Sequence, residues 1–222
     1  MCFSATASFV TAGVTGIAGL LAMTRVTHKR ELVLAAMPLV FAVQQSIEGL
    51  LWLHLPQGAG DPAVRPLTMA FLFFAEPFWP VFAPLAALLI ETDRNRRQVM
   101  LACAALGACV SAYLLWSLLT RMHGVVIEDG HIMYLNDHRS REAIGFAYLA
   151  ATGVPFLVSS RRAIAAMGAV LVVGSVTAYV FYWNHYVSVW CFFAAAGSVV
   201  LLVHFQHAQR RHRMSVTSPI KW

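Results

Sequence analysis

The chain has 222 residues, of which 59% are hydrophobic and only 12% are charged, and its mean hydropathy is +0.67. These values are typical of a polytopic membrane protein and exclude an ordinary soluble domain. The formal net charge of +6 would favour a nucleic-acid partner for a soluble protein, but here the basic residues lie between apolar runs, as topology determinants do. We therefore expect membrane lipids as partners and no nucleic acid.

A membrane-spanning helix needs about 20 mostly apolar residues, and seven stretches approach that length. In chain order they are 4–24, 32–54, 66–90, 98–120, 143–159, 163–182 and 186–206. The sequence therefore predicts an all-α integral membrane protein, a seven-transmembrane-helix bundle that forms a single domain over residues 1–206. A basic tail follows over residues 207–222.

The distribution of lysine and arginine predicts the orientation of this bundle. Twelve of the 16 Lys and Arg residues lie in segments 25–31, 91–97, 161–162 and 207–222, and the other four lie in the alternating segments. Because cytoplasmic loops carry the excess of positive charge, the N-terminus is expected outside and the C-terminus in the cytoplasm. The expected location is a bacterial inner (plasma) membrane.

The longest loop, 121–142, has the pattern of a β-hairpin. Asp129 and Gly130 stand between two apolar, β-branched stretches that run from Gly124 to Tyr134, which favours two short strands joined by a tight turn. On the expected topology this hairpin lies outside the membrane. The sequence leaves open whether it is a lid over an outward-facing cavity or a plain connector.

Two carboxylates, Glu48 and Glu76, lie inside the second and third predicted spans. A charged acid near a bilayer centre costs roughly 2.5 to 3.5 kcal/mol, so it normally protonates, pairs or binds a cation. At about 1.5 Å per residue, Glu48 lies roughly 9 Å below the outer end of its span, counted from His54, and Glu76 lies about 15 Å below Pro66. Both acids are therefore expected in the outer half of the membrane or near its midplane.

The surroundings of the two acids permit more than one role. Gln44 and Gln45 share a helix face with Glu48, and such a stripe can stabilise helix packing by about 0.6 kcal/mol per hydrogen bond without any further function. Glu76 is followed by three prolines, which are expected to kink the third helix: Pro77, Pro80 and Pro84. Broken helices at membrane depth line cavities or pack inside protein, which favours a site beside Glu76.

Cys2 and His185 are expected to approach the acids from the same outer side, in the first residues of the chain and in the turn between the last two spans. Together with Glu48 and Glu76 they would supply thiolate, imidazole and carboxylate donors, a set that suits zinc or another divalent transition metal. Removal of Met1 would add the α-amine of Cys2 as a ligand or nucleophile. The alternative histidine donors are more typical of a solvated surface: His54, His123, His131 and His138. At the cytoplasmic end, His204 and His207 lie one turn apart and could bind a metal, but they merge into the basic tail.

Three hypotheses about function follow. A catalytic metal would activate water for hydrolysis of a lipid or amphiphile, with Glu48 and Glu76 as ligand and general base. Alternatively, the acids carry protons or a cation in a small transporter or membrane sensor. In the third hypothesis they only pair across helices in a scaffold subunit.

The opening Met-Cys-Phe-Ser and the Gln-x-x-Glu formed by Gln45 and Glu48 resemble a family of multi-pass membrane proteins of unknown activity. The resemblance covers most of the chain and implies that Cys2 and Glu48 matter. The expected architecture is also loosely similar to the seven-helix alkaline ceramidases and adiponectin-type receptors, which imply an embedded zinc site and hydrolysis of lipid amides. This chain departs from their pattern because it lacks the His-x-x-x-His of the late helix.

Overall fold

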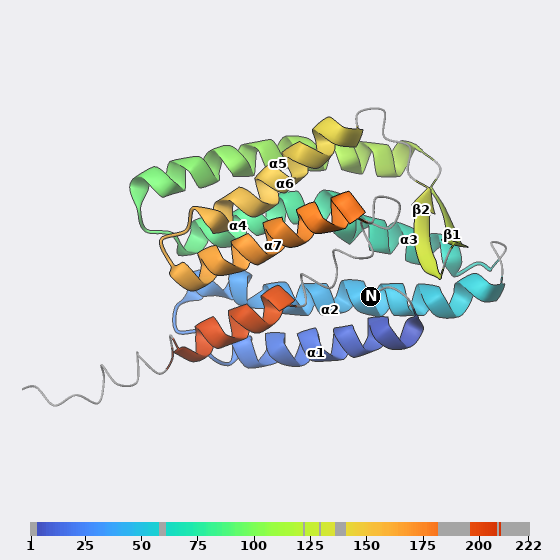
Figure 1. The fold of residues 1–222 in the computed structure, drawn as a ribbon, viewed down its shortest axis with the longest axis horizontal. Helices are drawn as coiled ribbons and strands as arrows, with labels where there is room; N and C mark the ends of the chain where they lie inside the picture. Colours follow the sequence, from blue (N-terminus) through green and yellow to red (C-terminus); the bar gives the residue numbers. More distant parts are fainter. Residues whose placement is uncertain are drawn as a thin grey trace, which may run out of the picture.

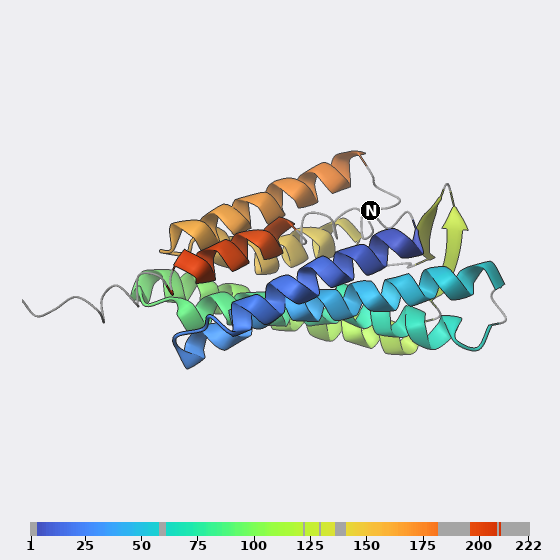
Figure 2. The same ribbon diagram turned by 90° about the horizontal axis from the view of Figure 1, so that it is seen from below.

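The computed structural model describes residues 4–57, 61–121, 123–128, 130–135, 141–181, 196–207 and 209. The molecule is an elongated bundle whose helices run nearly along one axis, with a two-stranded sheet at one end (Figure 1, Figure 2). We call this the hairpin end. The opposite end, formed by residues 24–31, 91–93 and 158–161, is called the basic end.

In chain order the labelled helices are α1 (Ala5–Met23), α2 (Leu32–His54), α3 (Val64–Phe73), α4 (Trp79–Ile90), α5 (Arg94–Thr120), α6 (Arg141–Leu157) and α7 (Arg162–Phe181). A π-helical turn, η3 (Phe74–Phe78), joins α3 directly to α4, and residues 196–207 form a further helix. The first six predicted spans are thus confirmed as helices. The seventh is helical over 196–206, and its first part, 186–195, lies outside the described residues.

Four helical stretches among the described residues are long and apolar enough to cross a membrane: Ala5–Met23, Lys29–His54, Val64–Ile90 and Arg94–Thr120. Two shorter apolar helices cover Glu142–Leu157 and Arg162–Thr177. This architecture is compatible with a membrane protein.

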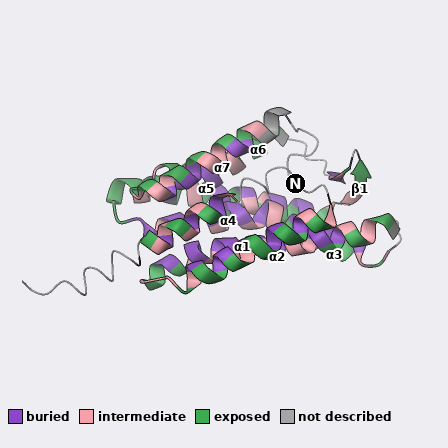
Figure 3. Cartoon of the chain, turned by 60° about the horizontal axis from the view of Figure 1, so that its bottom comes forward, coloured by how far each residue is buried: buried purple, intermediate pink, exposed green. Residues whose placement is uncertain are grey.

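Helix α1 has the burial pattern of a helix that faces hydrocarbon. Its buried face consists of small residues such as Thr11 and Thr15, whereas Val10, Val14 and Ile17 are 60%, 51% and 62% exposed. A soluble helix shows the reverse, with its apolar stripe facing the core. Figure 3 shows exposed residues on the outward faces of the bundle helices and buried residues between them.

Small residues let α1 and α2 approach closely. A Cβ atom added to Gly19 would lie 2.6 Å from Leu39 Cγ, and one added to Gly49 would lie 2.8 Å from Phe9. Glycine and other small residues have this role at helix contacts in membranes. The contacts between Gly19 and Leu39 and between Phe9 and Gly49 also fix the antiparallel register of the two helices.

The predicted hairpin is confirmed as β1 (Gly124–Glu128) and β2 (His131–Leu135), which pair antiparallel with Glu128 opposite His131. Gly130 has φ of +73°, a conformation that glycine adopts without strain. Ile132 and Tyr134 pack into a cluster with the ends of α2, α3 and α5, where Tyr134 stacks on Phe71 with ring centroids 4.8 Å apart. The hairpin is therefore packed onto the ends of three helices.

Two buried carboxylates hold the basic end together, and the sequence analysis missed both. Glu91 accepts hydrogen bonds from the backbone N–H of Ser160 (2.8 Å), Thr92 (2.9 Å) and Asp93 (3.0 Å), and another from the Ser160 hydroxyl (2.8 Å). Burial raises the pKa of Glu91, but these bonds outweigh it and lower the pKa to about 2. Glu31 forms an ion pair with Arg161 at 3.0 Å.

Candidate functional site: two buried acids beside a π-helical turn

Glu48 lies on α2 and is fully buried, as are its polar neighbours Gln44 and Gln45. The Gln45 side chain donates to Glu48 Oε2 at 3.1 Å. Gln44 turns to another helix, where its Oε1 accepts a hydrogen bond from the Trp79 indole at 2.9 Å. The predicted polar stripe is therefore buried as a unit, but its members divide between an intrahelical contact and a contact with α4.

Glu76 lies within the π-helical turn η3 and is 9% exposed. Proline has no N–H, and its ring clashes with the carbonyl four residues earlier, so Pro77 and Pro80 oppose a regular α-helix here. The chain responds by widening the turn to the i to i+5 pattern. The prolines predicted a kink in the third span, and the structure has a π-helical turn at this place.

Hydroxyl groups of neighbouring helices donate to two carbonyl groups of the π-helical turn, one of which a proline leaves without its donor. In the π pattern the donor to Ala75 would be residue 80, a proline, and the Ala75 carbonyl accepts instead from the Tyr148 hydroxyl at 2.8 Å. The Pro77 carbonyl accepts from the Ser111 hydroxyl at 2.5 Å. Glu76 therefore stands between two backbone groups that α6 and α5 hold in place.

The Gln44 to Trp79 hydrogen bond shows that the two acids lie at one depth. From this bond toward the hairpin end, Glu48 is four residues along α2 and Glu76 is three residues along the antiparallel third span. At about 1.5 Å per residue these steps are roughly 6 Å and 4.5 Å, so the acids differ in depth by only about 1.5 Å. Two buried carboxylates on neighbouring helices thus share one level of the bundle, which we call the acid level.

A third polar group approaches this level from α1. Ser8 is 1% exposed, and its hydroxyl has no hydrogen-bond partner among the described residues. The contact between Phe9 and Gly49 places Ser8 next to the level of Glu48. Ser8 could not be recognised from the sequence, because a single serine in an apolar helix is common and gives no indication of depth.

The other predicted ligands, Cys2 and His185, lie outside the described residues. Among the residues that the structure does describe, no group of three or more His, Cys, Asp and Glu side chains is placed to hold a metal ion. The structure thus brings Glu48 and Glu76 to one level and leaves the other half of the proposed ligand set as a prediction.

His54 lies on the hairpin side of the acids rather than at their level. Its Nδ1 is 2.7 Å from Asp61 Oδ2, and the other Asp61 oxygen accepts from the Ala63 backbone N–H at 2.8 Å. The Ala63 bond and the contact with His54 lower the pKa of Asp61. This pair anchors the connection from α2 to α3.

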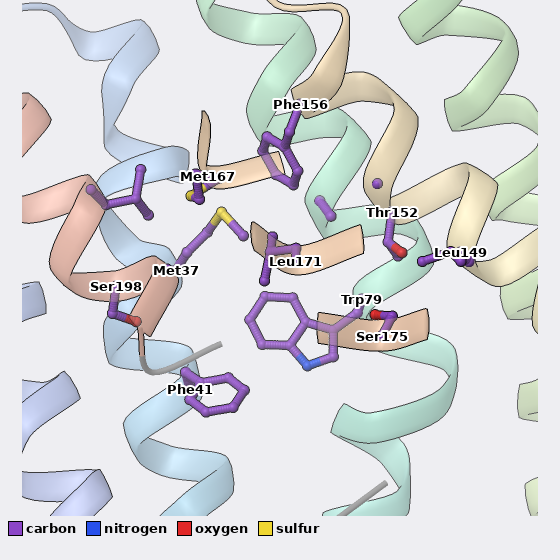
Figure 4. A pocket seen from close by; sticks show the side chains of 14 residues that line it. Met37, Phe41, Trp79, Leu149, Thr152, Phe156, Met167, Leu171, Ser175 and Ser198 are labelled. Carbon is purple, nitrogen blue, oxygen red and sulfur yellow. The ribbon is translucent and has the colours of Figure 1, made fainter. Parts of the chain in front are cut away.

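An apolar cavity adjoins the acid level on the side of the basic end (Figure 4). Trp79 forms part of its wall, with Phe41 beside it at a ring centroid distance of 6.0 Å. Figure 4 shows Met37 and Met167 near the indole ring and the hydroxyl groups of Thr152 and Ser175 on another side. Trp79 therefore lies between the cavity and the acid level, where its indole N–H donates to Gln44.

The fold and this site define a helical-bundle protein of membrane-compatible architecture with a level of buried carboxylates at a broken helix. A family model described as a family of unknown function, DUF6629, matches residues 1–217, and the chain belongs to this family. Comparisons with curated proteins and with solved structures gave no match.

Proposed function

We propose that this protein is a seven-span membrane protein that binds a divalent metal ion, zinc by its ligand chemistry, at the level of Glu48 and Glu76. The observation that carries the proposal is the placement of these two buried carboxylates at one depth on neighbouring helices. Cys2 and His185 complete the proposed ligand set.

The distribution of charge supports the orientation that this proposal includes. Glu31, Arg161 and Glu91 meet at the end that contains most of the basic segments, and the hairpin lies at the other end. By the positive-inside rule the basic end faces the cytoplasm, so the hairpin end and the N-terminus lie outside. The acid level then belongs to the outer half of the bundle.

A bound cation would offset the cost of holding both carboxylates in a dry interior. An isolated ionised carboxylate in an apolar medium is so unfavourable that it normally protonates, pairs or coordinates a metal. Thiolate, imidazole and carboxylate together are the donors of zinc sites, and a site with an open position lowers the pKa of its bound water to about 7. The carboxylate not used as a ligand would serve as general base in hydrolysis of a lipid or amphiphile.

The second candidate function is transport or sensing of a proton or cation. The π-helical turn at Glu76 favours it, because interrupted helices form ion sites near the middle of many transporters. Glu48 and Glu76 would then hold the transported ion only transiently. This candidate predicts substoichiometric metal after purification and ion flux in proteoliposomes.

Elemental analysis of the purified full-length protein distinguishes these proposals. The wild type is expected to carry about one zinc ion per chain, and the Glu48→Gln, Glu76→Gln double variant is expected to carry none. Glu128→Gln is the matched control, because Glu128 is an exposed acid of the hairpin. Metal absent from the wild type, or unchanged in a folded double variant, would refute the metal site and leave the acids as ion carriers or helix-pairing groups.

A further inference from the structure

A groove at the basic end lies between the start of α7 and the helix 196–207. Four of its lining residues carry basic side chains: Arg161, Arg162, His204 and His207. Valine side chains of the helix 196–207 form an apolar wall beside them. The groove therefore combines a basic part and an apolar part, as a binding site for an amphiphile does.

The arginines give the groove a fixed positive charge. Arg161 uses one of its N–H groups in the 3.0 Å ion pair with Glu31, which orients the guanidinium. Arg162 is exposed and begins α7, whose N-terminal dipole adds a partial positive charge. An anionic oxygen in the groove would thus meet the oriented guanidinium of Arg161 and the exposed guanidinium of Arg162.

The two histidines add ring nitrogens to the basic part of the groove. Nδ1 of His207 is 2.8 Å from the Val203 carbonyl, which can only accept, so this nitrogen carries a proton and Nε2 is left for another contact. Nε2 of His204 is buried and has no hydrogen-bond partner in the part of the chain that the structure describes. A buried polar atom without a partner is rare in native proteins, and a bound ion or water is one explanation for it.

The apolar wall indicates which kind of anionic ligand fits the groove. Val199 and Val203 are 48% and 43% exposed, and they lie on the helix face that lines the groove. We propose that this groove binds an anionic phospholipid, with the headgroup phosphate at Arg161, Arg162 and the histidines and an acyl chain along Val199 and Val203. Basic pockets between membrane helices bind anionic headgroups in this way.

The inference rests on the part of the proposed function that places the chain in a bilayer, and it is independent of the metal site. A free phosphate or nucleotide would share the charged contacts but would not use the valines. The valine wall and the position between two apolar helices favour a lipid.

The test uses full-length protein in a neutral detergent, titrated with phosphatidylglycerol, phosphatidylcholine or inorganic phosphate, with bound lipid counted by native mass spectrometry. The variant Arg162→Gln, His204→Gln leaves the Arg161 to Glu31 pair intact. We expect it to weaken phosphatidylglycerol binding by about tenfold or more, because it removes two side chains that would donate charge-assisted hydrogen bonds to the headgroup phosphate.

The control variant, Arg30→Gln, Arg94→Gln, removes exposed basic residues of the same end that do not line the groove. Its lipid binding is expected to stay within about twofold of the wild type. Equal losses in both variants, equal binding of phosphatidylcholine, or full competition by inorganic phosphate would overturn the proposal. Zinc content measured on the same samples separates the two proposals, since loss of lipid alone leaves the acid site untouched.

Discussion

Replacing Glu91 by glutamine tests whether the buried carboxylate holds the basic end together. Glu91 ends α4 and gathers hydrogen bonds from both the α4–α5 and the α6–α7 loops. Glutamine keeps the size of the side chain but replaces one accepting oxygen by a donating amide. At least one backbone N–H that now points at a carboxylate oxygen would then face another donor.

The pKa of Glu91 gives the expected magnitude. Lowering it from 4.5 to about 2 corresponds to about 3 kcal/mol of stabilisation, since one pKa unit is worth about 1.4 kcal/mol. Because the folded pKa lies below the unfolded one, this contribution is complete above about pH 4.5 and is lost as the pH falls toward 2. The Glu91→Gln variant is therefore expected to be about 3 kcal/mol less stable than the wild type at neutral pH.

Denaturant unfolding in detergent, followed by circular dichroism from neutral pH down to about pH 3, measures both effects. The difference in free energy of unfolding between wild type and Glu91→Gln should shrink as the pH falls below about 4.5. Glu128→Gln, at an exposed hairpin position, should match the wild type at every pH. Equal stability of Glu91→Gln and wild type at neutral pH, or a difference that does not change in acid, would refute the reasoning.

Two further substitutions test the packing around the π-helical turn. Gly107→Ala should destabilise the protein by about 3 kcal/mol or more, because its Cβ would lie 1.9 Å from the Pro80 carbonyl oxygen. The control, Gly145→Ala, has nothing within 4 Å of the added Cβ and should be neutral in the same unfolding assay. Trp79→Phe should lower the free energy of unfolding by about 1 to 2 kcal/mol, because it leaves the Gln44 amide oxygen buried without its donor. Trp116→Phe, at a 56% exposed position, is the control. A stable Gly107→Ala protein or an unaffected Trp79→Phe protein would contradict the respective contact.

The sequence predicted the helices well, because long apolar runs have few alternatives in a membrane-type chain. It placed the fourth helix too late, at residue 98, since hydropathy falls where the arginines begin. The helix starts at Arg94, where the Asp93 side chain accepts from the Arg96 backbone N–H at 2.9 Å and caps it. Capping is a local hydrogen bond that a hydropathy window does not register.

The end of the second helix also lies beyond the predicted boundary, which changes the distance of Glu48 from that end. The helix was expected to end at His54, but a 3₁₀ turn, η2 (Leu55–Gln57), continues it toward the hairpin end. At about 2.0 Å per residue this turn adds about 6 Å, which moves Glu48 from roughly 9 Å to about 15 Å below the helix end. Counted in the same way from the observed start of α3 at Val64, Glu76 lies roughly 18 Å below the end of its span, so the two acids lie within about 3 Å of one another in depth.

The contacts that define the site and the basic end could not be predicted, because they join residues far apart in the chain. Gln44 and Trp79 are 35 residues apart, and Glu31 and Arg161 are 130 residues apart. A single sequence identifies a costly buried acid by its apolar surroundings, but it does not identify which helix supplies the partner. The three prolines indicated a kinked helix, whereas the hydroxyl groups that bond to this turn come from two other helices.

The way Glu76 is held argues for more than helix pairing. A regular helix would present a carboxylate to a neighbour equally well, whereas a π-helical turn is rare and often occurs at functional sites. If the protein binds zinc as proposed and the Ser111 hydroxyl positions Glu76 through the Pro77 carbonyl, Ser111→Ala should weaken zinc binding by about tenfold without removing a ligand. Ser117→Ala on the same helix is the control, since the Ser117 hydroxyl has no hydrogen-bond partner among the described residues. Competition with a zinc chelator measures the zinc affinity of both variants. A Ser111→Ala protein that is less stable but has unchanged zinc affinity would show that the π-helical turn serves only helix packing.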